Sequence, residues 1–314
     1  MISQIKRVIS FIYFILYTIC CSKSLKLPLI KNKYSQFYNE WLNMSSYFYK
    51  KIFNSDIYYS GEFSTSNKID IVICNHISRI DSLLISSVIK NNTIKPVYPI
   101  IQKELKKIPL IGSFHKGCIV LERDFSKDKE TIINSIKNIN DGIIIIYPEG
   151  TRMNEENFKK SHEYCEKNQL KKYNNLLYPK MKGLDLIINE LSNSNKLGNL
   201  IDISFRVKDS LKFKTGYLDY IKHNVGNVYC NINSYKINKL CINNYDNLKS
   251  WLLMIWDKKE EYINEYHNYE YKLLKNKYRT STYILILTYF SFFIFYLKTF
   301  TNFSLFQKNN IVIN

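Results

Sequence analysis

The chain has 314 residues, which is enough for one core of roughly 150 to 200 residues with flanking segments. Its seven cysteines are odd in number and include no Cys-x-x-Cys pair, which argues against a disulfide framework and a zinc ribbon. The formal net charge of +18 occurs without a recognisable nucleic-acid module, so we expect the basic flanking segments to meet anionic lipid and no nucleic acid.

The amino terminus has the charged-then-apolar layout of a signal peptide, with Lys6 and Arg7 before an apolar stretch at residues 8–21. As a helix this stretch would be ~21 Å long, short of the ~30 Å thickness of membrane hydrocarbon. It could be cleaved, span with help from neighbours, or lie partly in the interface. Retention as a membrane anchor is the preferred interpretation, because lysines follow closely and the cysteines are not typical of a secreted protein.

Aromatic and aliphatic residues recur at roughly helical spacing over residues 34–53. They predict a helix whose broad aromatic face packs on the core or lies in the headgroup region of a membrane. Together with the apolar stretch before it, this helix makes residues 1–60 an expected region of membrane-anchoring and interfacial helices.

A run of residues at 69–74 that are apolar and mostly β-branched apart from Asp70 predicts a buried strand. His76 lies just beyond its carboxyl end, where open α/β sheets place their chemistry. Asp81 falls in the first turn of the next predicted helix, from which its carboxylate could reach an imidazole nitrogen. The two residues are typical of a base and its orienting group in acyl transfer. The alternative is an aspartate that only favours the helix dipole.

The next segments continue the alternation of strand and helix. Residues 95–101 predict a strand that tolerates a sheet edge, because they contain two prolines, and residues 103–112 predict a short helix. Residues 117–121 predict a third strand, and Arg123 emerges at its end. A guanidinium there would suit a phosphate, and a solvated ion pair with a neighbouring carboxylate is the alternative.

A crossover helix predicted at 128–140 leads to an apolar strand at 143–146, which is followed by Tyr147-Pro148-Glu149-Gly150-Thr151-Arg152. Repeated strand-helix-strand units predict an α/β fold with a mostly parallel sheet flanked by helices. Both polar loops would then share one sheet edge. Residues 153–168 predict a polar loop or exposed helix without the ligand spacing of a metal site, and residues 200–207 predict a final, half-buried strand.

The carboxyl-terminal part is predicted to be helical. Residues 251–278 predict an amphipathic helix whose charged face is solvated. Residues 283–297 are apolar and aromatic and would make a ~22 Å helix, consistent with a thin or re-entrant membrane span. We therefore expect a catalytic domain at 61–222, a helical extension at 223–278 and a membrane segment at 279–300, so that membrane-associated helices lie at both ends.

Three ordered motifs carry a resemblance to a known family: Asn75-His76-x4-Asp81, Gly117-x5-Arg123 and Pro148-Glu149-Gly150-Thr151-Arg152. Over residues 69–207 they resemble the glycerophospholipid acyltransferases, the 1-acylglycerol-3-phosphate acyltransferase family. Other segments are similar to the eukaryotic branch that includes lysocardiolipin acyltransferases, such as Asp202-Ile203-Ser204 and Trp256-Asp257-Lys258-Lys259-Glu260. Departures from the usual motif residues, at Ser82, residues 118–121 and Met153, bear on acyl and headgroup preference.

The resemblance implies a role for each motif residue. His76 would act as general base on a free glycerol hydroxyl, and Asp81 would fix the imidazole tautomer. The residues implied to bind the substrate are Arg123, Glu149, Gly150, Thr151 and Arg152. Among these, Arg152 would hold the acceptor's phosphate with Arg123 as a second candidate, and the others would shape that pocket.

The implied reaction transfers a fatty acyl group from acyl-CoA to a lysophospholipid, most simply 1-acyl-sn-glycerol 3-phosphate giving phosphatidic acid. Lysocardiolipin, lysophosphatidylinositol and glycerol 3-phosphate are alternative acceptors, and a non-catalytic lipid-binding protein is the alternative outside catalysis. Acyl-CoA enters as co-substrate, and we expect no cofactor and no metal because a thioester is already activated. The implied partners are these substrates and a membrane, of the endoplasmic reticulum or another endomembrane, with no obligate protein partner.

Overall fold

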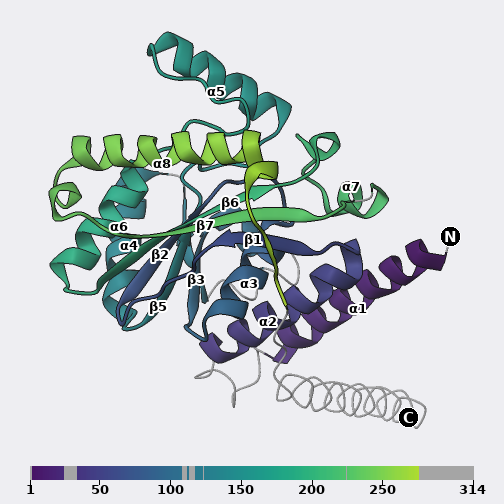
Figure 1. Ribbon diagram of the computed structural model, residues 1–314. Helices are drawn as coiled ribbons and strands as arrows, with labels where there is room; N and C mark the ends of the chain where they lie inside the picture. Colours follow the sequence, from purple (N-terminus) through teal and green to yellow (C-terminus); the bar gives the residue numbers. More distant parts are fainter. Residues whose placement is uncertain are drawn as a thin grey trace, which may run out of the picture.

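The computed structural model describes residues 2–24, 34–107, 112, 117–122, 124–223 and 225–275. In this part of the chain, eight strands form a sheet in the order β4-β3-β5-β2-β6-β7-β1-β8 (Figure 1). The strands are β1 (Ile57–Gly61), β2 (Ile69–Cys74), β3 (Val97–Gln102), β4 (Ile119–Leu121), β5 (Gly142–Ile146), β6 (Leu197–Arg206), β7 (Val228–Lys236) and β8 (Lys272–Leu273). Five of the seven pairings between these strands are parallel, and the β6–β7 and β1–β8 pairings are antiparallel. The predicted α/β fold with a mostly parallel sheet is confirmed.

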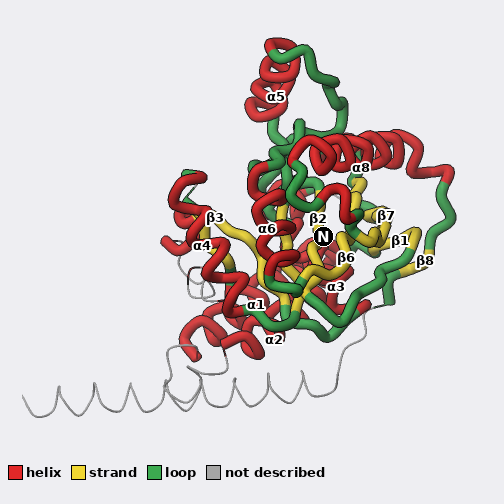
Figure 2. Tube along the Cα trace, turned by 90° about the vertical axis from the view of Figure 1, so that its left-hand side faces the viewer, coloured by secondary structure: helices red, strands yellow, loops and turns green. Residues whose placement is uncertain are grey.

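Helices cover both faces of this sheet. They are α1 (Ile2–Ser24), α2 (Tyr34–Phe53), α3 (Asp81–Asn92), α4 (Phe125–Asn138), α5 (Glu155–Lys167), α6 (Lys182–Asn193), α7 (Tyr217–Lys222) and α8 (Tyr245–Glu265). Helices α1, α2, α3 and α7 contribute to the core on one face, and α4, α6 and α8 to the core on the other (Figures 1 and 2). Helix α5 stands away from the sheet in both views.

The central position of β2 explains why its residues are apolar except for Asp70, which is buried and paired with Lys95. Ile69, Ile71 and Ile73 point into the core beneath α4, α6 and α8. Val72 and Cys74 point into the opposite core. A parallel strand covered on both faces has no polar side to alternate with, so all six of its residues are buried.

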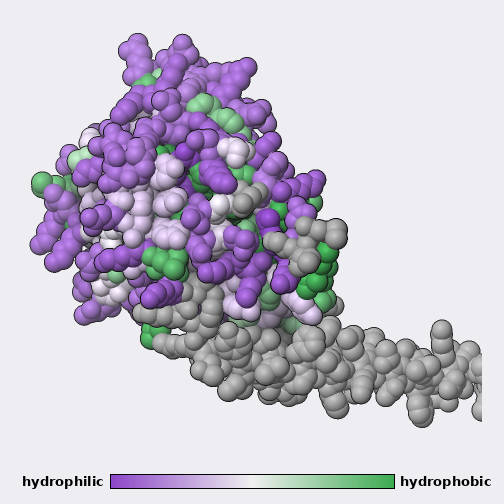
Figure 3. Space-filling model, turned by 45° about the vertical axis from the view of Figure 1, so that its right-hand side comes forward, coloured by the Kyte–Doolittle hydropathy of each residue, from purple (hydrophilic) through white to green (hydrophobic). Residues whose placement is uncertain are grey.

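Helix α1 is docked on the core while part of its apolar surface stays exposed. Its exposed apolar side chains recur at helical spacing: Ile5, Val8, Ile9, Ile12, Tyr13 and Leu16. Arg7, in contrast, is buried, and it donates to the carbonyl oxygens of Ile52 at 2.9 Å and Tyr220 at 3.1 Å. By length and composition the segment Gln4–Ser22 could cross a membrane, a test that a signal sequence also passes. Figure 3 shows a largely hydrophilic face with hydrophobic residues gathered toward its lower right edge.

The prediction that residues 95–101 tolerate a sheet edge is corrected, because β3 lies between β5 and β4. Its two halves pair on opposite sides, residues 97–99 with β5 and residues 100–102 with β4. Pro99 therefore ends one ladder before the other begins. A residue without an N–H is tolerated at such a position because it does not interrupt a two-sided ladder.

The sheet also extends further along the chain than the sequence indicated. β6 is not the final strand, since β7 pairs with it and β8 follows α8. Residues 223–278, expected to be a helical extension, thus add two strands to the same sheet. Within the predicted helix at 103–112, the described residues form a 3-10 helix at Lys103–Lys107. The predicted membrane segment at 279–300 lies outside the described residues.

Candidate active site

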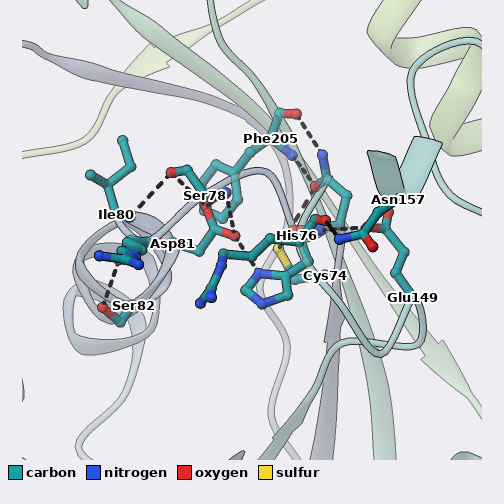
Figure 4. A network of polar contacts seen from close by, with 12 residues as sticks. Cys74, His76, Ser78, Ile80, Asp81, Ser82, Glu149, Asn157 and Phe205 are labelled. Carbon is teal, nitrogen blue, oxygen red and sulfur yellow. Dashed lines mark hydrogen bonds and ion pairs between the residues drawn. The ribbon is translucent and has the colours of Figure 1, made fainter. Parts of the chain in front are cut away.

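The carboxyl end of β2 is fixed by its neighbour β6. The Asn75 side-chain amide donates to the Phe205 carbonyl oxygen at 2.9 Å, and the Phe205 N–H donates to Asn75 Oδ1 at 2.8 Å (Figure 4). Asn75 is buried, so these bonds replace the water that its polar atoms lose. They determine where the chain leaves the sheet, one residue before His76. The sequence motif contained Asn75 but assigned it no role.

The imidazole and the carboxylate that the sequence paired are in contact (Figure 4). His76 Nδ1 lies 2.7 Å from Asp81 Oδ2, and the two side chains are 19% and 1% exposed. The Ser78 N–H donates to both carboxylate oxygens, at 3.0 and 3.1 Å. Burial raises the pKa of Asp81, and the hydrogen bond to His76 opposes this rise. A carboxylate held in this way favours an N–H at Nδ1 and leaves Nε2 to accept a proton.

The loop after β5 binds both backbone polar groups of His76. Glu149 Oε2 accepts the His76 N–H at 3.2 Å, and the Met153 N–H donates to the His76 carbonyl oxygen at 2.8 Å. Because β2 and β5 are parallel neighbours, their loops leave the same sheet edge. Glu149 is 2% exposed, and burial raises its pKa to about 8, opposed by the His76 N–H and by the charge of Lys259. Its carboxyl group therefore faces the backbone N–H of His76.

The remaining motif residues form the turn beside this contact. Gly150 has φ +69°, in the left-handed region that favours glycine. Thr151 Oγ1 and the Arg152 carbonyl oxygen both accept from the Asn157 side-chain amide, at 3.0 and 2.8 Å. The Arg152 guanidinium is near enough to Asp81 to oppose the rise of its pKa. The turn thus brings an arginine to the His76–Asp81 pair and ties it to α5.

Two aromatic side chains at the site were not predicted. The Tyr147 ring stacks on the imidazole of His76, with centroids 4.2 Å apart and planes inclined by 25°. Tyr217 of α7 lies beside Ser82, within electrostatic range of Arg152. Tyr147 directly follows β5, so its place at the sheet edge shared with His76 could have been predicted from the sequence. Tyr217 comes from a distant helix, and no local pattern marks it.

Arg123 lies outside the described residues, so its predicted place beside a phosphate stays a prediction. Among the residues that the structure describes, no group of three or more His, Cys, Asp or Glu side chains is arranged to hold a metal ion. The side chains that do come together are a partly exposed imidazole, a buried carboxylate and an arginine. This arrangement can remove a proton from a hydroxyl group next to an anionic substituent.

A family model described as Acyltransferase matches residues 56–225, which is more than half of the chain. This chain belongs to the acyltransferase family. The resemblance read from the three motifs is thereby confirmed at the level of the family. The matched range of this acyltransferase contains β2, α3 and the loop after β5, and ends before α8.

Two curated proteins similar to this acyltransferase are named as acyltransferases of 1-acyl-sn-glycerol 3-phosphate and of lysocardiolipin. It is 25% identical over 255 residues to the probable 1-acyl-sn-glycerol-3-phosphate acyltransferase 5 of Arabidopsis thaliana, covering 77% of this chain and 66% of that relative. It is 23% identical over 240 residues to lysocardiolipin acyltransferase 1 of Mus musculus, covering 73% and 62%. The chain thus spans slightly less than two thirds of the length of these relatives.

A solved structure has the same fold as this acyltransferase. It is the crystal structure of the 1-acyl-sn-glycerophosphate (LPA) acyltransferase PlsC from Thermotoga maritima, with a TM-score of 0.53. The match covers 83% of this chain and 99% of that one at 16% sequence identity. At this identity the likeness describes the fold alone.

Proposed function

We propose that this chain is a membrane-bound acyltransferase that transfers a fatty acyl group from acyl-CoA to a free hydroxyl of a lysophospholipid. The first candidate acceptor is 1-acyl-sn-glycerol 3-phosphate, which would give phosphatidic acid. The observation that carries the proposal is the 2.7 Å contact between His76 Nδ1 and Asp81 Oδ2 at a partly exposed imidazole. The names of the relatives support a lysophospholipid as the acceptor.

In the proposed reaction, His76 Nε2 takes the proton of the acceptor hydroxyl while the hydroxyl oxygen attacks the thioester carbonyl carbon. Negative charge moves to the carbonyl oxygen, and the carbon–sulfur bond breaks as the carbonyl re-forms. The departing CoA thiolate takes the proton from the imidazolium and leaves as free CoA. Asp81 stabilises the imidazolium between these steps. Such base assistance typically contributes about 10² to 10⁴ in rate.

Arg152 is proposed to bind the acceptor's phosphate, because a guanidinium matches phosphate oxygens bidentately and this one lies near the base. Arg123 is the second candidate for that role. Glu149 is proposed to position His76 instead of contacting the phosphate, because its buried carboxyl group accepts the His76 N–H. The turn between Glu149 and Arg152 shapes the pocket.

Helix α1 is proposed to seat the protein on an endomembrane, such as that of the endoplasmic reticulum. Its exposed apolar stripe supports this, because a helix with one apolar face binds at the membrane interface. Both the acceptor and the acyl chain are lipids. A site at the membrane surface avoids moving them through water.

The mouse relative's name supports monolysocardiolipin as a second candidate acceptor. Lysophosphatidylinositol and glycerol 3-phosphate offer the same chemistry, a free hydroxyl near a phosphate. A non-catalytic lipid-binding protein would have no need for a buried carboxylate oriented on a partly exposed imidazole, so catalysis is the stronger proposal.

The proposal is tested by expressing the chain in membranes and measuring CoA release from oleoyl-CoA with each acceptor. The panel contains lysophosphatidic acid, glycerol 3-phosphate, lysophosphatidylinositol, lysophosphatidylglycerol and monolysocardiolipin, and mass spectrometry identifies the acylated product. We expect acceptor-dependent release with lysophosphatidic acid or another lysophospholipid. Folded protein that releases no CoA with any acceptor would favour the non-catalytic alternative.

A further inference from the structure

Lys259 of α8 is a buried lysine whose ammonium group is fully hydrogen-bonded to β6. Its Nζ donates to Asp202 Oδ1 at 2.5 Å, to the Ile203 carbonyl oxygen at 2.9 Å and to Ser204 Oγ at 3.0 Å. The Lys259 side chain is 0% exposed and that of Asp202 is 2% exposed. These three bonds use all three donors of the ammonium group. A buried charge is tolerated because it has this complete set of partners.

The residues that Lys259 holds lie beside the end of the strand that delivers the base. Asp202 and Ile203 pair with Ile73 and Cys74, the last two residues of β2. The next bonds along the same edge are those between Phe205 and Asn75, described above. Fixing this part of β6 therefore fixes the point where the chain turns toward His76.

The charge of Lys259 also acts on the second loop of the site. Four neighbouring groups shift the pKa of Glu149: the His76 N–H, the backbone of Leu177, Lys259 of α8 and Asp81 of α3. Lys259 favours the ionised form of Glu149, whereas Asp81 and burial disfavour it. The ammonium group thus favours the ionised form of the Glu149 carboxyl group, which accepts the His76 N–H.

Helix α8 is itself held in place around Lys259. Glu260 accepts the N–H groups of Asn174 and Asn175, at 2.8 Å for Asn174 and 3.1 Å for Asn175, and Trp256 Nε1 donates to the Leu177 carbonyl oxygen at 3.0 Å. Figure 1 shows α8 lying across the sheet. The charged face predicted to be solvated is therefore partly buried, because it meets the interior of the sheet and the loop at 173–177.

We propose that Lys259 is a positioning residue of the acyl-transfer site: it holds the end of β6 that fixes Asn75 and provides the positive charge beneath the Glu149–His76 contact. This inference rests on the proposed function. Helix α8 lies beyond residues 56–225, the range that the family model matches, so by this inference the acyl-transfer site depends on a helix outside that range.

The test compares the wild type with Lys259→Met, the double variant Asp202→Asn/Lys259→Met, and Lys258→Met as a control at the exposed neighbouring position. The single variant leaves the Asp202 carboxylate buried without its partner, which can impair folding. The double variant removes both charges and is expected to fold with a Tm close to the wild type. For each protein kcat and KM are measured with the best acceptor across a pH series, together with hydrogen exchange of peptides spanning residues 70–80.

In the double variant we expect kcat to fall about 10²-fold, because a small displacement of a base is costly, with both KM values nearly unchanged. The acidic limb of its kcat profile should move to higher pH, since Glu149 loses the charge that favours its ionised form. Exchange at residues 70–80 should become about tenfold faster, as expected when a local contact is lost. Lys258→Met should match the wild type in all three measurements.

A double variant with wild-type kcat, pH profile and exchange would overturn the inference, because Lys259 would then only neutralise Asp202. If the wild type acylates no acceptor, the proposed function fails, and the exchange measurement still decides whether Lys259 fixes the His76 loop. In that case, exchange at residues 70–80 that is faster in the double variant but not in Lys258→Met supports the positioning contact. Unchanged exchange in the double variant rejects it.

Discussion

Glu149 Oε2 accepts the backbone N–H of His76 at 3.2 Å while the Glu149 side chain is almost fully buried. The glutamate of the loop after β5 is thus turned toward the backbone N–H of His76, and Arg152 of the same turn lies close enough to Asp81 to oppose the rise that burial causes in the pKa of its carboxyl group. Burial raises the pKa of Glu149 to about 8. A protonated carboxyl group still accepts through its carbonyl oxygen, but more weakly than a carboxylate, so the contact with His76 is strongest when Glu149 is ionised.

The raised pKa of Glu149 predicts that stability falls as pH increases. Between the ordinary pKa of 4.5 and about 8, the folded protein keeps a proton that the unfolded chain has lost. Stability therefore declines as pH rises through this window. Glu149→Gln keeps an accepting oxygen and removes the titration, so its Tm should decline less than that of the wild type. Thermal unfolding of both proteins across a pH series checks this, and parallel curves would argue against a buried ionisable group.

Replacing Asp81 by asparagine should abolish most activity without unfolding the protein. An amide does not favour the N–H at Nδ1 or stabilise the imidazolium, so kcat should drop by about 10² to 10⁴. Asp185 also lies in the first turn of a helix, α6, and Asp185→Asn is the matched control. Equal activity in the two variants would mean that Asp81 serves only the helix dipole.

Gly150→Ala should destabilise the turn that carries Arg152. A left-handed residue with a Cβ costs about 1 to 2 kcal/mol, and the added methyl group would lie 3.3 Å from the Lys180 side chain. Gly183→Ala is the control, because this glycine lies in α6 and a Cβ there meets only an ordinary contact at 3.6 Å. Urea unfolding should show a loss for Gly150→Ala and none for Gly183→Ala. A Gly150→Ala variant as stable as the wild type would refute the expectation that a Cβ strains the backbone at this position.

Arg7 should contribute to stability in spite of its place in an apolar helix. Arg7→Leu would leave the Ile52 and Tyr220 carbonyl oxygens without the donors that now satisfy them, at a cost of about 1 to 3 kcal/mol. Lys6→Leu removes a charge from an exposed neighbour and should change stability little. Thermal unfolding in detergent compares the two variants. Equal stability would show that α1 is not held to the core by Arg7.

The strands that carry the site were predictable because burial on both faces leaves a run that is apolar throughout in β5 and apolar except for Asp70 in β2. Residues 69–74 were assigned with the bounds that β2 has, and residues 143–146 lie within β5. The loops after β2 and β5 were expected to meet, because parallel neighbouring strands end at the same edge of a sheet. The α2 prediction had the observed bounds as well, because its aromatic residues repeat at helical spacing.

Strands and side chains that reach the sheet from distant parts of the chain could not be predicted from such local patterns. β7 alternates Val228, Cys230 and Ile232 with polar residues, but two asparagines weaken that signal. Lys259 was assigned to a solvated helix face, because sequence periodicity does not reveal that its ammonium group pairs with the buried Asp202. Its role depends on tertiary contacts, and these override local pattern.

The central claim, that His76 is the base of an acyl transfer, is tested most directly by CoA release with His76→Ala. Wild-type protein and variant are assayed at equal amounts in the same membranes, with the best acceptor and with none. The account predicts acceptor-dependent CoA release by the wild type and its loss, by about 10² or more, in the variant, with an unchanged Tm. Acceptor-dependent release that persists in His76→Ala would contradict it.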